Sequence, residues 1–344
     1  MTAVEAEAGA RILSAVAEER VSPVVMERLY SIAALFGEDL RIVAEELEKA
    51  VHDGVPRATD AAAHLLAAGG KRVRPMTVLL AAACFGPIAK PARELAVVAE
   101  LVHLATLLHD DVVDDGMDRR GLPASRLLWG NAVSVLAGDL LLTHSLERTS
   151  AVGNAPVLSA LFKTLRSLVD GEIIQLRGRT ALDPSEETYW RIIEGKTASL
   201  FGWACSSGAI INGADAEQAT ALRRFGEEMG MAFQIVDDVI DFSGENTGKR
   251  IFNDLREGKM TLPVIRLLAR DSGSRTLVDA ARAGEEPAAR DIGDRLRKSG
   301  ILESTRKQAE ERVRDATRDL ESLPKTEARE LLAEVALELT SRRG

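Results

Sequence analysis

The stretch ELVHLATLLHDDVVD, residues 100–114, leads from a strongly apolar segment directly into three aspartates. At 100° per residue on a helix, Asp110 and Asp114 share one face, and His103 falls on that face two turns earlier. Two carboxylates this close repel each other unless a cation lies between them. Carboxylate oxygens suit Mg²⁺, which keeps several waters and commonly bridges to phosphate. Asp111 points about a quarter turn away, where it could orient the other two by hydrogen bonds.

A second cluster, DDVID at 237–241, repeats the first, and the apolar residues MAFQIV precede it directly. One such motif by itself is weak evidence for a metal site, because an ordinary solvated helix end can carry the same residues. Here both acidic groups emerge from apolar helical sequence, where buried carboxylates are costly and need counter-charges or a metal. Two clusters set far apart in the chain therefore suggest two walls of one metal–diphosphate site.

Helical periodicity runs through almost the whole chain, with no alternating β pattern of useful length. Glycine and proline mark the breaks, as at Gly69-Gly70, Gly121 and Pro123, and 243–248 is expected to be a loop. We predict an all-α fold: one domain over 1–344, with 1–22 an N-terminal extension and long helices around a central cavity. The principal helices are expected at 24–51, 76–85, 92–113, 131–151, 156–177, 185–211 and 215–242.

Composition narrows the function further. The net charge of −9 over 344 residues argues against a general nucleic-acid binder, which needs a basic footprint. Cys84 and Cys205 lie in apolar stretches and are expected to be buried thiols in a reducing compartment. The start MTAVEAEAGARIL is acidic and unlike a signal peptide, and no apolar run is long enough to cross a bilayer. We therefore expect a cytoplasmic protein.

Basic residues gather in two places near the first acidic cluster. GGKRVRP at 69–75 puts three cations on a glycine-rich turn that opens a helix, an arrangement that suits an anion. Arg119 and Arg120 follow just after the aspartates, and guanidinium groups match diphosphate oxygens. Each basic group taken alone is more often part of a solvated, charged surface than of a binding site. Two of them beside an acidic cluster, in an acidic protein, favour substrate phosphate.

With these residues in view, the chain resembles the trans-type polyprenyl diphosphate synthases, relatives of farnesyl and geranylgeranyl diphosphate synthase. The resemblance covers roughly 25–340 and implies the isoprenoid synthase type I fold. It also implies Mg²⁺-dependent head-to-tail condensation of isopentenyl diphosphate onto an allylic diphosphate. The matching pieces stand in the family's order: GGKRVRP (69–75), LLHDDVVDDGMDRRG (107–121), GKTASL (195–200), FQIVDDVID (233–241) and DLREGKMTLP (254–263).

The resemblance also implies roles for single residues. Three Mg²⁺ ions per active site would be held by Asp110, Asp111, Asp114, Asp237, Asp238 and Asp241. The pocket for isopentenyl diphosphate would contain Lys71, Arg72, Arg74, His103 and Arg120. The allylic diphosphate would be clamped by Arg119, Lys196 and Lys259, and covered by Lys249. Oxygens near the developing allylic cation would come from Thr197 and Gln234, with Gln175 a further polar group of the pocket.

In this family, bulky residues just before the first cluster close the floor of the product tunnel. Ala105 and Thr106 are small, so we predict a long product of about six to ten isoprene units, C30 to C50, as for a quinone side chain. The alternative is that Ala105 is ordinary helix packing and another helix supplies the stopper.

Two departures from the family pattern concern the end of the second cluster. The loop at 243–248 is about two residues shorter than usual, which puts the reach of Lys249 in doubt. Phe252 stands where the family commonly has glycine, so lid closure or substrate preference could differ.

Three other functions remain open. They are a short-chain geranylgeranyl or farnesyl diphosphate synthase, a terpene cyclase, and a non-catalytic partner subunit. The basic pocket argues against a cyclase, and the six retained aspartates argue against a non-catalytic subunit. The resemblance further implies a homodimer, and a long apolar product would leave through transient membrane contact.

Overall fold

The fold is described from a computed structural model, which describes residues 23–181, 184–243 and 252–341. Apart from one hairpin of two short strands, every regular element in these ranges is helical, which confirms the predicted all-α fold. The chain divides into two compact units. Unit 1 comprises the residues up to 160 with 204–220 and 323–332, and unit 2 comprises 161–203, 221–322 and the residues from 333. The single domain and its central cavity stay predictions.

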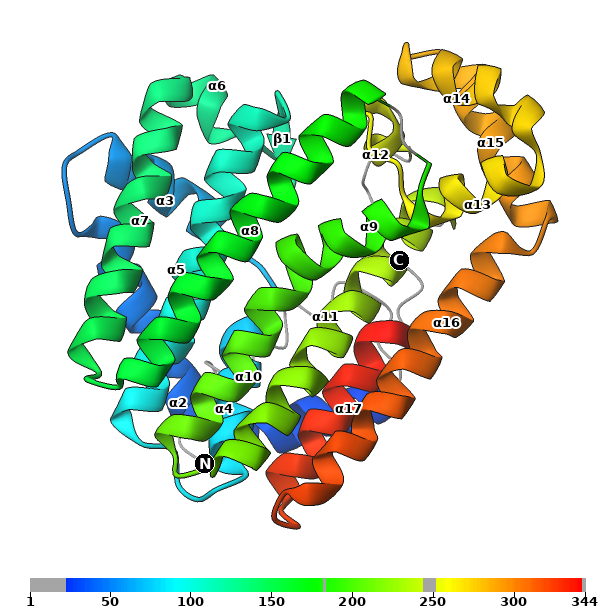
Figure 1. Cartoon of the computed structure of the whole chain (residues 1–344). Helices are drawn as coiled ribbons and strands as arrows, with labels where there is room; N and C mark the ends of the chain where they lie inside the picture. Colours follow the sequence, from blue (N-terminus) through cyan, green and yellow to red (C-terminus); the bar gives the residue numbers. More distant parts are fainter. Residues whose placement is uncertain (1–22, 182–183, 244–251, 342–344) are drawn as a thin grey trace. The chain divides into compact units, whose positions relative to one another are not determined.

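Unit 1 is built around two long helices, α5 and α7, which lie side by side (Figure 1). Leu101, Leu104 and Leu108 on α5 are completely buried. Burying each contributes about 1.5–3 kcal/mol relative to exposure. Gly138 lets the helices approach, because a Cβ there would lie 2.3 Å from Nε2 of His109. The elements are α2 (Pro23–His52), α3 (Ala58–Ala67), α4 (Val73–Ala83), α5 (Lys90–Val113), β1 (Asp118–Arg119), β2 (Leu122–Pro123), α6 (Ser125–Trp129) and α7 (Asn131–Ala151).

The hairpin replaces the simple loop predicted around Gly121. Strands β1 and β2 pair antiparallel, with Arg119 opposite Leu122. The two residues between them, Arg120 and Gly121, both have positive φ, 54° and 79°. Two consecutive positive φ angles are typical of the tight hairpin turns whose twist matches that of paired strands. The turn therefore fixes the direction in which the two neighbouring arginines leave the backbone.

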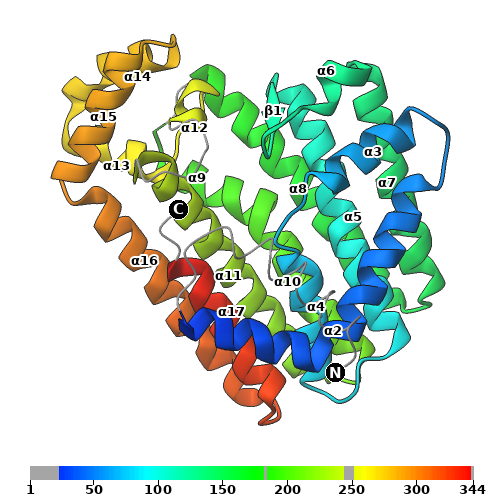
Figure 2. The ribbon, with the colours of Figure 1, turned by 180° about the vertical axis from the view of Figure 1, so that it is seen from behind.

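Four helices contribute residues to both units: α8 (Ala155–Ala181), α10 (Ser199–Ile211), α11 (Ala216–Ser243) and α17 (Glu327–Ser341). The rest of unit 2 consists of shorter helices, which Figure 2 shows from behind. They are α9 (Glu186–Ile193), the π-helix η1 (Glu194–Ala198), α12 (Asn253–Arg256), α13 (Leu262–Arg270), η2 (Ser272–Ser274), α14 (Arg275–Arg282), α15 (Glu286–Lys298), α16 (Ile301–Ala316) and η3 (Thr317–Ser322).

The helix predicted at 185–211 is interrupted. It begins as α9, where the N-cap Ser185 accepts a hydrogen bond from the backbone N–H of Thr188 at 3.3 Å. At Glu194 it widens into η1, and it continues as α10. Such π-turns are frequently found at functional sites. The periodicity of apolar residues could not reveal this turn, because a single wide turn shifts the pattern by only one residue.

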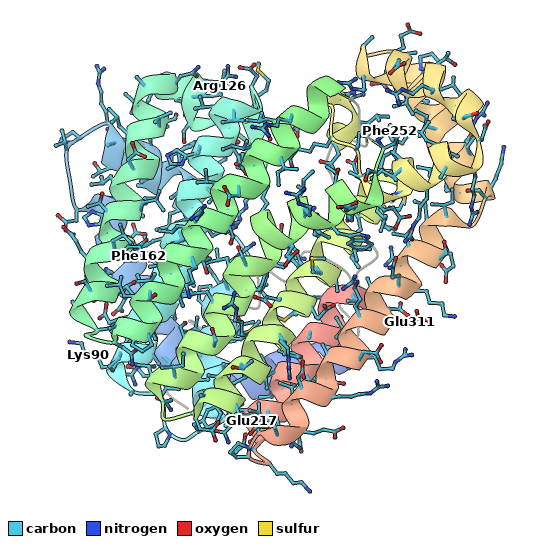
Figure 3. The ribbon with its side chains drawn as sticks, viewed as in Figure 1. Lys90, Arg126, Phe162, Glu217, Phe252 and Glu311 are labelled. Carbon is cyan, nitrogen blue, oxygen red and sulfur yellow. The ribbon has the colours of Figure 1, made fainter. Side chains whose placement is uncertain are left out.

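The packing around Phe252 accounts for a phenylalanine at a position where the family commonly has glycine. Its φ is +65°, a left-handed conformation that is costly for a bulky residue. Its ring is 1% exposed, packs 5.9 Å from the ring of Phe242, and fills the space left by Gly293. A Cβ at Gly293 would lie 2.8 Å from that ring. Figure 3 labels the side chain in unit 2. Burial of the ring thus offsets the backbone strain.

Cys84 and Cys205 are free and buried, and burial raises the pKa of Cys84 to about 11 and that of Cys205 further. Among the helices in the described part of the chain, none is both long and apolar enough to cross a membrane.

Candidate active site

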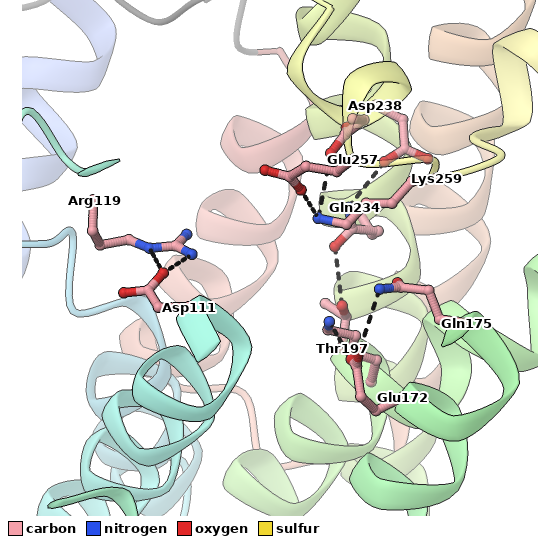
Figure 4. A network of polar contacts seen from close by, with 11 residues as sticks. Asp111, Arg119, Glu172, Gln175, Thr197, Gln234, Asp238, Glu257 and Lys259 are labelled. Carbon is pink, nitrogen blue, oxygen red and sulfur yellow. Dashed lines mark hydrogen bonds and ion pairs between the residues drawn. The ribbon is translucent and has the colours of Figure 1, made fainter. Parts of the chain in front are cut away.

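The first aspartate cluster forms the last turn of α5 and its C-cap. Asp110 and Asp114 are partly exposed, whereas the side chain of Asp111 is 1% exposed. Oδ1 of Asp111 accepts hydrogen bonds from Nε of Arg119 at 3.0 Å and from its Nη2 at 2.5 Å (Figure 4). Burial raises the pKa of Asp111, and the Arg119 guanidinium opposes this rise. Asp111 therefore joins the hairpin arginine to the helix end. Its predicted part in orienting Asp110 and Asp114 stays a prediction.

The second cluster, on α11, repeats this pattern of exposure. Asp237 and Asp241 are partly exposed, and Asp238 is 3% exposed. Oδ1 of Asp238 accepts a hydrogen bond from Nε2 of Gln234 at 2.9 Å, and Oδ2 accepts one from the Tyr189 hydroxyl at 2.7 Å. Burial raises the pKa of Asp238 well above its usual value, and the nearby Asp254 adds to the rise.

The accessible acids fit Mg²⁺ by their chemistry. In each cluster the first and last carboxylates are a turn apart and partly exposed, although Oδ2 of Asp241 is buried, and the middle carboxylate is buried. Oδ2 of Asp111 is a buried oxygen without a hydrogen-bond partner in the described chain. No three carboxylate, imidazole or thiolate groups of the described residues converge closely enough to enclose a metal by themselves. Such a set suits an ion that keeps waters and takes further ligands from a phosphate.

A group of basic residues surrounds His103 in unit 1, on the helix that carries the first cluster. His103 is partly buried, and its surroundings lower its pKa well below the ordinary 6.5. Burial is the main cause, followed by the nearby guanidinium groups. The imidazole is therefore neutral at pH 7, and the positive field around it belongs to the arginines. These are Arg74, Arg120, Arg72 and Arg119.

Two of these arginines are held differently. Arg72 forms an ion pair with Glu100, whose side chain is 3% exposed, and its Nη2 donates to the carbonyl of Leu66 at 3.3 Å. Arg120 is exposed and lies against Gly70, where a Cβ would come within 2.7 Å of its Nη1. Arg72 is thus committed to a buried carboxylate, and Arg120 remains open to an anion. Lys71 is also exposed.

Arg126 on α6 braces the turn between the aspartates and the hairpin. Its Nη2 donates to Oδ1 of Asp115 at 2.8 Å, and its Nη1 donates to the carbonyl of Gly116 at 3.1 Å. Asp115 itself has a positive φ of 52°. One guanidinium thus fixes both ends of a strained turn, so the direction in which β1 leaves α5 depends on a residue outside every motif.

The π-turn η1 in unit 2 carries Lys196 and Thr197. Lys196 forms an ion pair with Glu172 on α8, and Thr197 donates from Oγ1 to Oε1 of Gln234 at 3.0 Å. Glycines bring the backbones together: a Cβ at Gly171 would lie 2.8 Å from the backbone N of Lys196. Figure 4 shows Thr197 and Gln234 in contact, with Glu172 and Gln175 nearby. Nε2 of Gln175 lies 3.5 Å from Oε1 of Glu172.

Lys259, the other predicted clamp, lies among carboxylates. Its Nζ is 2.5 Å from Oε2 of Glu257 and 3.7 Å from Oδ1 of Asp254. Burial raises the pKa of Asp254, and Lys259 opposes the rise. The structure thus gives Arg119, Lys196 and Lys259 each a carboxylate partner. An anionic substrate would compete with these carboxylates for the cations. Lys249 lies outside the described residues.

Sequence reasoning missed several of these partners. Glu100, Glu172, Tyr189, Asp254 and Arg126 carried no motif of their own, although Asp254 stood inside a quoted one. Glu100, Glu172 and Tyr189 lie 28, 24 and 49 positions from their partners, so local spacing holds no signal for them. Arg126 and Asp254 lie nearer to theirs, 11 positions from Asp115 and five from Lys259. The shared exposure of Asp110, Asp114, Asp237 and Asp241 follows the predicted helix faces. The placement of both clusters around one cavity stays a prediction.

The two residues predicted to set product length behave differently. Ala105 is fully buried. Thr106 is partly exposed, and its Oγ1 donates to the carbonyl of His103 at 2.8 Å. Thr106 therefore lies on the accessible face of α5 with His103 and Asp110, as helical geometry predicts. The role of Ala105 in product length remains an expectation from the resemblance.

Comparison with known proteins agrees with this geometry. Residues 55–296 match the family model of the polyprenyl synthetases. The chain is 37% identical over 320 residues to heptaprenyl diphosphate synthase component 2 of Geobacillus stearothermophilus, covering 92% of this chain and 99% of that protein. It is 33% identical over 317 residues to octaprenyl diphosphate synthase of Escherichia coli (strain K12), covering 90% and 97%.

Solved structures give the same result. The crystal structure of a decaprenyl diphosphate synthase from Rhodobacter capsulatus matches with a TM-score of 0.85 and 37% identity, over 91% of this chain and 99% of that one. A polyprenyl synthase from Caulobacter crescentus, complexed with calcium and isoprenyl diphosphate, matches with a TM-score of 0.86 and 36% identity, over 91% and 97%. The chain therefore belongs to the polyprenyl synthetase family and is a prenyltransferase.

Proposed function

We propose that this chain is a Mg²⁺-dependent long-chain polyprenyl diphosphate synthase, which adds isopentenyl diphosphate head-to-tail to an allylic diphosphate. The observation that carries the proposal is the shared exposure of the two clusters. In each, the outer aspartates are partly exposed, and the middle aspartate is buried and held by hydrogen bonds. Relatives named as heptaprenyl, octaprenyl and nonaprenyl diphosphate synthases support the long product.

The metal would be held by Asp110, Asp114, Asp237 and Asp241, with Asp111 and Asp238 orienting their helix ends. Bound Mg²⁺ would supply electrophilic stabilisation of the departing diphosphate. Arg119, Lys196 and Lys259 would hold the same diphosphate through charge-assisted hydrogen bonds, exchanging their carboxylate partners for it. Three ions per active site remain the expectation from the family resemblance.

The second substrate would bind at the basic residues around His103 in unit 1. Lys71, Arg74 and Arg120 would hold the diphosphate of isopentenyl diphosphate, with the neutral His103 as a hydrogen-bonding group. The double bond then attacks the allylic carbon as its C–O bond breaks, and the proton lost from the new chain goes to the released diphosphate. Apolar helix faces would exclude water from the cation.

One assay tests this function. Purified protein with farnesyl diphosphate, isopentenyl diphosphate and Mg²⁺ should give products of C30 to C50 on separation by chain length. Excess EDTA should abolish turnover, and adding back Mg²⁺ should restore it. A protein that shows no turnover with any allylic primer would contradict the proposal.

A short-chain synthase remains the second candidate, because a relative named as a short chain isoprenyl diphosphate synthase is 34% identical over 301 residues. Product length separates the two candidates. A wild-type protein whose products are all C15 or C20 would favour the short-chain enzyme. The substitution Ala105→Phe should shorten the product by several isoprene units relative to the wild type.

We further propose a homodimer that uses an apolar stripe on α8. Phe162, Val169, Ile173 and Leu176 fall on one helical face and are 53%, 57%, 43% and 37% exposed. Phe162 is labelled in Figure 3. Light scattering should give twice the chain mass of 37.1 kDa, and Phe162→Glu with Val169→Glu should give monomers. Because two relatives are named as components, a monomer that assembles only with a second polypeptide would contradict the homodimer.

We also propose that the protein is cytoplasmic and that its product becomes a quinone side chain. Product release would involve transient contact with a membrane. Flotation with liposomes, with and without substrates present, would test the membrane contact. Association that appears only while long products are being made is expected.

A further inference from the structure

Tyr189 on α9 is a buried polar residue for which no role has been assigned. The chain has only two tyrosines, and this one is 4% exposed. Its hydroxyl lies 2.7 Å from Oδ2 of Asp238. A phenylalanine would fill the same space without a polar group to satisfy, so ordinary core packing does not account for the hydroxyl.

Asp238 makes its two hydrogen bonds with donors from different elements. Tyr189 on α9 serves one oxygen, and Gln234, one turn earlier on α11, serves the other. Both oxygens are therefore engaged, and the carboxylate is nearly inaccessible at 3% exposure. Asp237 and Asp241, by contrast, are partly exposed. This geometry suits an anchor better than a metal ligand.

The hydrogen bonds continue in one direction from Asp238. Because Gln234 gives its amide N–H to Asp238, its amide oxygen is turned toward Thr197. Thr197 must then donate its hydroxyl hydrogen to that oxygen at 3.0 Å. This arrangement leaves the lone pairs of the Thr197 oxygen available for another group. An oxygen with available lone pairs would stabilise positive charge nearby, whereas a hydroxyl hydrogen turned outward would not.

We propose that Tyr189 is a positioning residue: its hydroxyl fixes Asp238, and through Gln234 it sets the direction in which the Thr197 hydroxyl points. The inference rests on the proposed function, because it assigns Thr197 to the developing allylic cation. It adds α9 to the parts that organise the second aspartate cluster. It also separates Asp238 from its neighbours, since Asp238 orients α11 and Asp237 and Asp241 remain for the metal.

Tyr189→Phe is the direct test, because it removes one oxygen and keeps the ring. Oδ2 of Asp238 would lose its donor, and the Asp238 side chain would rotate away from Gln234. Turnover should fall about tenfold, with KM for isopentenyl diphosphate unchanged, because one hydrogen bond to a carboxylate is lost away from that substrate. The affinity for inorganic pyrophosphate with Mg²⁺, measured by calorimetry, should fall several-fold.

A double-mutant cycle shows whether the effect passes through Asp238. In an Asp238→Ala background no acceptor remains, so adding Tyr189→Phe should change kcat by less than about twofold. The matched control is Thr305→Val, which removes another fully buried hydroxyl of unit 2, one that accepts a hydrogen bond from Nη1 of Arg266. It should leave kcat and pyrophosphate affinity as in the wild type.

The outcomes separate the inference from the proposed function. Wild-type kcat and pyrophosphate affinity in Tyr189→Phe would overturn the inference, as would full additivity with Asp238→Ala. A lowered melting temperature with unchanged kcat would mean a structural role only, and would also overturn it. If the wild type makes no polyprenyl product, the proposed function fails. The double-mutant cycle, measured as affinity for pyrophosphate with Mg²⁺, then decides whether Tyr189 acts through Asp238.

Discussion

The two aspartate clusters share a sequence pattern but are supported in different ways. In unit 1, the buried Asp111 is held by the charged Arg119 of the hairpin, which we also expect to hold substrate. In unit 2, the buried Asp238 is held by the neutral donors Tyr189 and Gln234. The first support can be drawn away by an anionic substrate, and the second cannot. Identical motifs can therefore couple to substrate to different degrees.

We expect the largest loss of activity at the outer aspartates, in which the two clusters are alike. Asp110→Asn and Asp237→Asn should each lower kcat/KM about a thousandfold, because metal ligation contributes several kcal/mol to the transition state. The measurement is steady-state condensation with Mg²⁺ varied. Asp53→Asn, at an exposed aspartate just after α2 that belongs to neither cluster, is the control and should stay within about threefold of the wild type. Losses that differ by more than a hundredfold between the two clusters would break the proposed likeness.

The charged support of unit 1 should show in stability. Arg119→Ala leaves the buried Asp111 carboxylate without its counter-charge, which should lower the free energy of unfolding by about 3 kcal/mol in urea denaturation at pH 7. Arg119→Ala combined with Asp111→Asn removes both charges and should recover most of that loss. If the double variant is no more stable than Arg119→Ala, the ion pair is not the cause.

The apolar support of unit 2 can be tested at Phe252. Its backbone N–H donates to the carbonyl of Asp241 at 3.1 Å, so its position fixes the end of the second cluster. Phe252→Gly relieves the positive φ but loses the buried ring, for a net loss of about 2 kcal/mol. Phe252→Ala loses the ring and keeps the strain, so it should be about 1 kcal/mol worse than glycine. Thermal or urea unfolding that ranks alanine above glycine would contradict the strained conformation.

The smallest effect concerns pH and belongs to unit 1 alone. The pKa of His103 is well below 6.5 in the folded state, so above pH 6.5 both folded and unfolded chains hold it neutral. Below pH 6.5 only the unfolded chain gains the proton, and stability falls as pH falls. Between pH 6.5 and 5.5 this contributes about 1 kcal/mol of lost stability.

His103→Gln should remove that contribution, so the variant should lose about 1 kcal/mol less than the wild type over the same interval in urea denaturation. His52→Gln is the control, because that histidine is exposed at the end of α2. A wild type and a His103→Gln variant with equal slopes would show that His103 is not held neutral.

Much of the architecture was predictable because helical periodicity is a local property. The ends of α5, α7 and α11 fall within a few residues of the predicted boundaries, and the accessible faces of both clusters follow from their spacing. The π-turn at 194–198 was not predictable. It depends on the close approach of Gly171 and Gly195, which lie on different helices.

The sequence by itself determined the helices, the two pairs of outer aspartates, and the nearby basic residues. Each of these depends on neighbours within one or two helical turns. Tertiary structure alone decided which partner each buried charge takes: Glu100 for Arg72, Arg119 for Asp111, and Tyr189 for Asp238. A buried polar group must find its partner wherever the packed chain supplies one, and for Glu100 and Tyr189 that partner is 28 and 49 positions away.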